Sequence, residues 1–280
     1  MPALSPASSA KKLMSPRCLS RLCGAQGLLV LFGMVFLWAT AGAWAQQAVP
    51  YPTDVDATAA GPLRITPIQH ASVMLEWDGK VIDVDPVGTQ FFAGLPKADL
   101  ILITHDHSDH MDPKAIAMIR KPDTIFVVPA TVKKTITEAQ VVMSNDQSRT
   151  VNLGSVAVPI EAVPMYNLVR KRPNGQAYHP KGEGNGYILT LGGKRIYFSG
   201  DTECTPELKA LRNIDIAFLS MNLPYTMPVE EAAACVKVFR PKIVYPYHYR
   251  GQNTQVFADA LKGEPGITVR LRDFYQSAPK

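Results

Sequence analysis

Short apolar runs begin near residue 62 and are separated by tight turns. Runs of this length that are rich in Val, Ile and Leu predict β-strands, whereas apolar residues three and four apart predict helices. The first three strands follow one another directly, and Asp78-Gly79 predicts a hairpin turn between the second and the third. These strands are predicted at residues 63–69, 72–77 and 80–85.

From residue 99 onward, strands alternate with helices, which predicts sheets covered by helices. Further strands are predicted at residues 99–104, 124–129, 147–153, 156–163, 186–191, 194–199, 214–221 and 242–247. Helices are predicted at residues 113–120, near 131–139, from 206, at 228–239 and at 254–262. Two strand-rich halves, each finished by helices, predict an α/β (α+β) fold: a four-layer αβ/βα sandwich of two mixed sheets flanked by helices.

The first 45 residues (1–45) predict a secretory signal peptide. Four basic residues precede an uncharged apolar stretch, and Ala-Trp-Ala at 43–45 supplies small residues where a signal peptidase cleaves. A retained membrane anchor is the alternative, because the apolar stretch is slightly long for a cleaved signal. We expect cleavage, a mature chain that begins near Gln46 without a stable membrane span, and a periplasmic or secreted protein.

Beyond the leader, residues 46–61 predict a polar, Pro-containing connector and residues 62–280 predict one well-buried domain. The leader holds 4 of the 29 Lys and Arg residues and none of the 24 Asp and Glu residues, so the remainder is nearly neutral. A nearly neutral chain without a basic groove argues against a nucleic-acid partner.

Only two of the four cysteines, Cys204 and Cys235, follow the leader. They could form one disulfide, although a domain of this size does not need it. We interpret Cys235, inside the predicted helix 228–239, as a small buried apolar residue. Cys204 stays ambiguous, because it lies close in sequence to a candidate metal ligand.

The strongest chemical signal is the run His-Asp-His-Ser-Asp-His at residues 105–110, which directly follows an apolar strand. Residues two apart in an extended chain point the same way, so His105 and His107 can face one point. Asp109 and His110, on the turn that follows, can face a second point nearby. Imidazole and carboxylate groups in this spacing can hold two cations.

This HxHxDH run after a buried strand resembles the signature of the metallo-β-lactamase superfamily. The resemblance implies that His105 and His107 bind one metal ion, and that Asp109 and His110 bind a second. It extends over nearly all of residues 62–280 and implies the four-layer sandwich that the strand pattern also predicts.

Two later residues fit the remaining ligands that the resemblance implies. Asp201 lies in a Gly-Asp-Thr turn at a strand end, the position of the family's carboxylate that bridges both ions. His248 ends a late apolar strand, the position of the histidine that completes the second site. A lone Gly-Asp-Thr turn is common, and a lone histidine is more often structural, but their order after the first motif favours ligands.

The third histidine of the first site departs from the family pattern, because Asn167 stands where that histidine is expected. Asn167 could coordinate weakly through its amide oxygen. His179, in a Gly-rich turn between two strands, could instead fold back and supply the imidazole. We expect His179 to be the ligand, with contact to the substrate as its alternative role.

His70 precedes the second predicted strand. This placement resembles the branch that contains the ascorbate-lactonase-like enzymes and the N-acyl-phosphatidylethanolamine phospholipase D group. We expect His70 at the rim of the site in a catalytic role, with Asp85 beneath it as support for the ligands. His70, Tyr225 or Tyr249 could donate a hydrogen bond to a developing oxyanion.

The resemblance implies hydrolysis of an ester, lactone, amide or phosphodiester bond in a small-molecule or lipid-like substrate, by water that two divalent ions activate. Asp109 and Asp201 would orient this water or accept its proton. Zn²⁺ fits the imidazole-rich ligand set, and Mn²⁺ or Fe²⁺ fits where carboxylate and amide oxygens replace imidazole.

Two other functions are compatible with the same motifs. A di-iron oxidoreductase is one, but the superfamily members of that kind carry a flavin-binding domain that this sequence lacks. A non-catalytic metal-binding module is the other, and the nearly complete ligand set argues against it.

Overall fold

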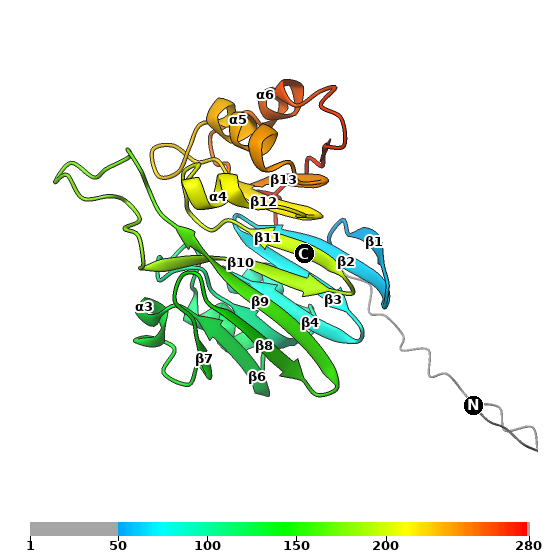
Figure 1. Cartoon of the computed structure of the whole chain (residues 1–280). Coiled ribbons are helices and arrows are strands. Elements are labelled where there is room, and N and C mark those ends of the chain that lie inside the picture. Colours follow the sequence, from blue (N-terminus) through cyan, green and yellow to red (C-terminus); the bar gives the residue numbers. More distant parts are fainter. Residues whose placement is uncertain (1–49, 279–280) are drawn as a thin grey trace, which may run out of the picture. The chain divides into compact units, whose positions relative to one another are not determined.

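Two seven-stranded mixed sheets form the centre of the computed structural model, which describes residues 50–278 (Figure 1). The predicted signal peptide, residues 1–45, lies outside the described residues. The first sheet contains, in spatial order, β1 (Asp54–Thr58), β2 (Gly61–Gln69), β3 (Ser72–Trp77), β4 (Lys80–Val84), β5 (Ala98–Leu102), β6 (Arg120–Val128) and β7 (Val141–Val142). The second contains β8 (Ser148–Leu153), β9 (Val156–Met165), β10 (Gly184–Leu191), β11 (Lys194–Phe198), β12 (Ile216–Ser220), β13 (Ile243–Tyr247) and β14 (Thr268–Val269).

Each sheet changes from antiparallel to parallel pairing along its length. In the first sheet β1 to β4 pair antiparallel and β4 to β7 pair parallel. In the second sheet the change comes at β11. Parallel neighbours need crossover connections, and helices provide most of them.

Helices cover the outer face of each sheet, which completes four layers. Those of the first half are α1 (Thr89–Phe92), α2 (Pro113–Ile119) and α3 (Ala130–Lys133); those of the second are α4 (Pro206–Ala210), α5 (Val229–Phe239) and α6 (Thr254–Ala260). One apolar cluster lies between the two sheets, and one lies between each sheet and its helices. The predicted αβ/βα sandwich is confirmed.

Strand β5 shows why the apolar runs are continuous in the parallel part of the sheet. Leu100 and Leu102 belong to the cluster between the sheets, whereas Ile101 and Ile103 pack under the helices of the first half. Successive side chains of a strand point to opposite faces, so a strand buried on both sides has no polar alternation. The end of such a strand is a firm base for a functional loop.

The segment expected as a connector, 46–61, was predicted incorrectly in part, because it contains β1. Acidic residues of this edge strand pair with the last part of the chain. Asp56 accepts two hydrogen bonds from Arg270, at 2.7 and 2.8 Å, and Asp54 accepts one from the Tyr245 hydroxyl at 2.7 Å. The polar pattern that indicated a connector therefore reflects ion pairs across an edge strand.

Other differences concern short elements. The structure adds α1, β7 and β14, which are too short to produce a periodic pattern, and the helix expected near 131–139 covers only Ala130–Lys133. Cys204 and Cys235 form a disulfide with a Cα–Cα distance of 5.8 Å. The interpretation of Cys235 as a small buried apolar residue is therefore right about its burial but wrong about its chemistry, because its sulfur is in a disulfide. None of the helices within residues 50–278 is long and apolar enough to cross a membrane.

Candidate metal centre

The residues of the HxHxDH run meet two distant residues at one edge of the sandwich. His105 follows β5, Asp201 follows β11, and His248 follows β13. These strands belong to the parallel parts of the two sheets, so their carboxyl ends gather at one edge. In α/β sheets, sites form in the crevice outside these strand ends.

The possible ligand atoms form three groups that share members, and in each group all atoms lie within 4.8 Å of one another. One of them, His105 with His110 and Asp201, links the other two. The first ligand group consists of His105, His107 and His179. The second ligand group consists of His70, Asp109, His110 and His248.

Asp201 lies between the two groups and reaches both. Its Oδ2 is 3.3 Å from Nε2 of His179, in the first group. Its Oδ1 is 3.3 Å from Nε2 of His110 and 3.4 Å from Nε2 of His248, in the second group. A carboxylate with one oxygen toward each group can offer a ligand atom to both groups.

Four buried atoms at the centre have no hydrogen-bond partner among the described residues. They are Nε2 of His105, Nε2 of His110, Nε2 of His248 and Oδ1 of Asp201. Leaving a buried polar atom unsatisfied costs about 1–3 kcal/mol, and four at one point need an explanation. Imidazole nitrogens and carboxylate oxygens are the donors that zinc prefers, so these residues fit a bound divalent cation.

The ionisation of the site also suits a metal. Burial lowers the pKa of His70 and of His179 to about 4 and that of His105 well below its usual value. Burial alone would raise the pKa of Asp201, but the surrounding histidines hold it well below its usual value. Burial alone would lower the pKa of His110, but the carboxylates of Asp201 and Asp85 raise it well above its usual value, so this ring must lose a proton before it binds a metal. The other imidazoles named here are neutral beside an ionised carboxylate, which are the protonation states that coordinate metals.

Asp85 lies behind the second ligand group and fixes the ring of His110. The fully buried carboxylate accepts hydrogen bonds from the Thr104 backbone N–H and hydroxyl, both at 2.7 Å. It also accepts one from Nδ1 of His110 at 2.8 Å. Nε2 of His110 is thereby left free to face Asp201. The structure thus places Asp85 in contact with His110 rather than beneath His70.

His70 lies inside the second ligand group and not at the rim, because its ring is buried and its centre lies 3.9 Å from that of the His248 ring, with the two planes tilted by 45°. Its Nε2 is 3.1 Å from Oδ2 of Asp109, and its Nδ1 is 2.8 Å from the Tyr275 hydroxyl. In the neutral ring, Nε2–H donates to Asp109 and Nδ1 accepts from Tyr275. Tyr275 was not predicted from the sequence.

Asn167 lies behind His179 and does not point at the other ligand atoms. Its amide oxygen accepts from the backbone N–H of His179 at 2.7 Å and from the ring Nδ1 at 3.0 Å. Its amide nitrogen donates to Glu203 and to the Tyr225 carbonyl. The oxygen that could have coordinated a metal is thus occupied in orienting His179.

The loop that carries both Asn167 and His179 spans residues 166–183, and we call it the strap. It extends away from the sheets between β9 and β10 (Figure 1). Buried Glu203, two residues after Asp201, accepts hydrogen bonds from three successive backbone N–H groups of the strap at 2.8–3.1 Å. Because Glu203 carries no motif, its role in holding the strap was not predicted.

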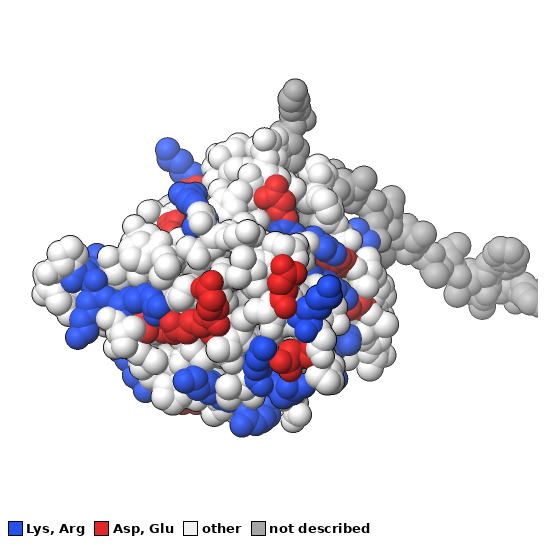
Figure 2. Space-filling model, turned by 90° about the horizontal axis from the view of Figure 1, so that it is seen from above, with Lys and Arg blue, Asp and Glu red and all other residues white. Residues whose placement is uncertain are grey.

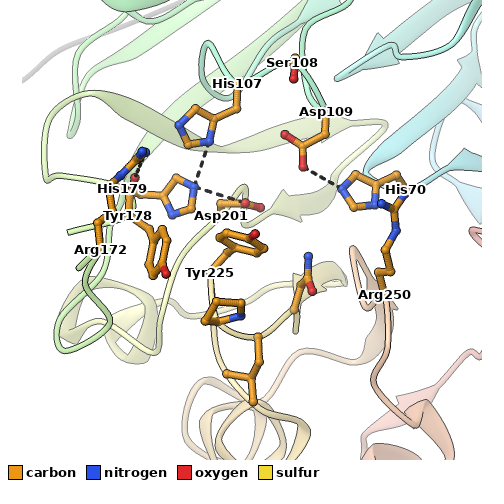
Figure 3. A pocket seen from close by; sticks show the side chains of 13 residues that line it. His70, His107, Ser108, Asp109, Arg172, Tyr178, His179, Asp201, Tyr225 and Arg250 are labelled. Atoms are coloured by element: carbon orange, nitrogen blue, oxygen red, sulfur yellow. Dashed lines mark hydrogen bonds and ion pairs between the residues drawn. The ribbon is translucent and has the colours of Figure 1, made fainter. Parts of the chain in front are cut away.

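A cavity of about 670 Å³ opens over the two ligand groups (Figure 3). Tyr225 lines it, as predicted, and its ring meets that of Tyr178 edge to face at 5.1 Å. The cavity is lined by His70, His107, Ser108, Asp109, Arg172, Tyr178, His179, Asp201, Asn222, Leu223, Pro224, Tyr225 and Arg250.

Tyr249 is not in the cavity wall, contrary to the prediction. Its hydroxyl donates to the Arg272 carbonyl at 3.1 Å and accepts from the Phe274 N–H at 3.2 Å. These bonds tie the hydroxyl to the backbone of the C-terminal segment. This tyrosine therefore supports the fold and does not line the cavity.

Comparisons with known proteins agree with this fold. The model of the beta-lactamase superfamily domain matches residues 64–248. A metal-dependent hydrolase from Enterococcus faecalis is 30% identical over 218 residues, which cover 69% of this chain and 92% of that protein.

Two solved structures are also similar. A candidate metal-dependent hydrolase from Parabacteroides distasonis has a TM-score of 0.72 and 44% identity, over 81% of this chain and 100% of that one. A metallo hydrolase from Ignicoccus hospitalis shares the fold, with a TM-score of 0.62 and 24% identity over 76% of this chain and 96% of that one. The chain therefore belongs to the metallo-β-lactamase superfamily and is one of its hydrolases.

Proposed function

We propose that this hydrolase is metal-dependent and that its centre holds two divalent cations, with zinc favoured by the imidazole-rich donor set. The observation that carries the proposal is the convergence of three buried, unsatisfied imidazole nitrogens and the unsatisfied Oδ1 of Asp201 at one point. The first ligand group would hold one ion. Asp109, His110 and His248 would hold the other, and Asp201 would give one oxygen to each.

When bound, such ions lower the pKa of water toward neutrality and polarise the bond under attack. Asp109, whose side chain is 52% exposed to the cavity, is placed to accept the proton that the attacking water loses and to return it to the leaving group. His70 donates a hydrogen bond to Asp109 and fixes its direction. The Tyr225 side chain forms part of the wall and can donate to the oxygen that gains charge.

A chain of hydrogen bonds holds His70 and Asp109 in place. The backbone N–H of Arg250 donates to the Tyr275 hydroxyl at 2.9 Å, and that hydroxyl bonds to His70, which bonds to Asp109. A general base works best when its orientation is fixed by the groups behind it. The proposed reaction is hydrolysis of an ester, lactone, amide or phosphodiester, and the branch suggested by His70 stays a prediction.

We also propose that the protein acts in the periplasm or outside the cell. The N-terminal residues have the basic, apolar and small-residue order of a secretory signal. The Cys204–Cys235 disulfide supports this proposal, because such bonds persist in oxidising compartments. Cell fractionation and the mass of the mature chain test it. A mature chain that begins near Gln46 is the expected result, and a cytoplasmic full-length chain would contradict it.

Metal content and chelation test the proposed reaction. Purified protein should contain two equivalents of metal and hydrolyse at least one generic substrate among a nitrophenyl ester, a lactone, an anilide and bis-p-nitrophenyl phosphate. A chelator should remove the activity, and Zn²⁺ or Mn²⁺ should restore it. Hydrolysis that survives complete metal removal would contradict the proposal. Substrate-dependent consumption of dioxygen would favour the di-iron alternative.

A further inference from the structure

Two arginines of the cavity wall, Arg172 and Arg250, have no acidic partner among the described residues. Seven of the eleven arginines in residues 50–278 lie within 4.0 Å of a carboxylate oxygen. Of the remaining four, these two line the same cavity. A planar guanidinium with free N–H groups is suited to a carboxylate or a phosphate, so the wall is ready for a charge that the ligand brings.

Tyrosine rings hold both guanidinium groups. The Arg172 guanidinium lies 5.7 Å from the centre of the Tyr178 ring, and one of its nitrogens donates to the Tyr178 carbonyl at 3.2 Å. The Arg250 guanidinium lies 5.5 Å from the centre of the Tyr275 ring. Stacking on a ring restricts a guanidinium while it leaves in-plane donors for a ligand.

The two arginines lie on opposite sides of the ligand groups. Figure 3 shows Arg172 beside His179 and Arg250 beside His70, with Asp201 between them. A ligand that spans the reacting centre can therefore meet a guanidinium at either side. The strap adds Lys171 next to Arg172, both exposed, and Figure 2 shows Lys and Arg side chains gathered on the lobe at the left, where the strap extends in Figure 1.

The net charge of the wall follows from these contacts. Asp109 and Asp201 are the acidic residues that line the cavity, and both face the ligand groups. This inference rests on the proposed function, since two bound cations would more than offset these two carboxylates. The remaining charge of the wall is then positive, which draws anions into a partly enclosed cleft.

We infer that the substrate is an anion: it carries a carboxylate or phosphate group apart from the bond that is hydrolysed, and Arg172 and Arg250 bind that group. A neutral ester or lactone lacks a partner for either guanidinium and binds more weakly. The shared chemistry is an oxyanion with two or more acceptor oxygens, which matches the paired donors of a guanidinium.

Direct binding tests this inference without turnover. Calorimetry on the zinc-loaded protein would use inorganic phosphate and succinate as probes and compare wild type with the double variant Arg172→Gln/Arg250→Gln. Each hydrogen-bonded charge pair contributes enough that its loss should weaken binding about tenfold, and the double loss about a hundredfold. Whichever probe binds more tightly identifies phosphate or carboxylate as the preferred group.

A matched control removes the same charge elsewhere. Arg149 and Arg212 are exposed, have no carboxylate partner within 4.0 Å among the described residues, and lie outside the cavity wall. The variant Arg149→Gln/Arg212→Gln should bind both probes as wild type does. Equal affinity of the two double variants, or no binding of either probe to wild type, would overturn the inference. Metal content is measured in every variant, so that loss of an ion is not mistaken for loss of a guanidinium.

Paired substrates separate this inference from the proposed function. p-Nitrophenyl acetate and mono-p-nitrophenyl succinate share a leaving group and differ by one carboxylate. Wild type should show a KM about tenfold lower for the charged ester, and the cavity variant should lose this preference. Arginine-dependent anion binding without hydrolysis of any ester would contradict the proposed function alone. Hydrolysis without a preference for the charged ester would contradict the anionic substrate alone.

Discussion

The two ligand groups differ in how the chain brings them together. In the second group His248 directly follows β13, and His110, in the turn after β5, is buried and tied by its ring to Asp85 at the end of β4. The first group is complete only when His179 arrives on the strap, a loop without regular strands or helices. A site built on strand ends is set by the fold, whereas a site closed by a loop depends on what holds the loop.

Each group relies on one buried residue that orients a histidine. Asp85 fixes His110 from the end of β4, at a position that the sheet determines. Asn167 fixes His179 from within the strap, and Glu203 holds that part of the strap through its backbone. In the proposed two-ion centre, we therefore expect the ion at the first ligand group to be bound more weakly than the ion at the second.

Replacing Asp201 should have the largest effect, because its carboxylate is the contact that both groups share. Asp201→Ala should lose both ions and hydrolytic activity. This loss is larger than the decrease in metal affinity or activity, about 10–100-fold, that follows from replacing a residue that only supports a ligand. Metal analysis and kcat/KM measure it. Asp106→Ala is the control, since Asp106 lies exposed in the same motif. An Asp201→Ala protein that keeps two tightly bound ions would remove Asp201 from the ligand set.

His179→Ala separates the two groups. It should leave the protein with one equivalent of metal, because the second ligand group does not include this residue. The matched variant His248→Ala should lose the other ion, which can be followed with Co²⁺ through the change in its visible spectrum. Two full equivalents in His179→Ala would show that the strap supplies no ligand and would end the distinction between the groups.

The Cys204–Cys235 disulfide lies next to Glu203, which holds the strap, and it can be removed by mutation or reduction. Cys204 follows Glu203, and the bond closes a loop over a separation of 31 residues, so Cys204→Ser/Cys235→Ser should lower the free energy of unfolding by about 4 kcal/mol. Urea unfolding measures the loss, and reduction of wild type should reproduce it. Affinity for the first ion should fall more than affinity for the second. Equal losses would show that the disulfide supports the fold as a whole.

The sequence allowed the fold and the strand-end part of the site to be predicted because both depend on local pattern. Residues 105–110, Asp201 and His248 follow apolar strands, and strand order determines that they meet. β1 was missed because its acidic residues, such as Asp54, look like a polar connector until their cationic partners are known. Tertiary ion pairs of this kind leave no periodic signal.

The contacts of the strap show the limit of sequence patterns more clearly. No local sequence pattern indicates that Glu203 accepts hydrogen bonds from three backbone N–H groups. Likewise, none indicates that Tyr275 contacts His70, which is 205 residues away in the sequence. The open choice between Asn167 and His179 had the same cause, since both belong to one loop. In the structure the Asn167 amide oxygen lies 3.0 Å from Nδ1 of His179, a contact that no sequence pattern indicates.

The smallest effects should come from the two orienting residues, and they sharpen the comparison most directly. Asn167→Ala removes the acceptor for Nδ1 of His179, so affinity for the first ion should fall by about 10–100-fold while the second stays bound. Asp85→Asn keeps the shape of the side chain but removes the charge behind His110, so affinity for the second ion should fall instead.

Asn174→Ala, exposed on the strap, is the control. Titration with Zn²⁺ against a competing chelator measures both affinities. Asn167→Ala should also release the first ion faster, because the ring of His179 is then no longer oriented. If both variants weaken the same ion, the two groups form a single coupled centre and the strap is no less firm than the strand ends.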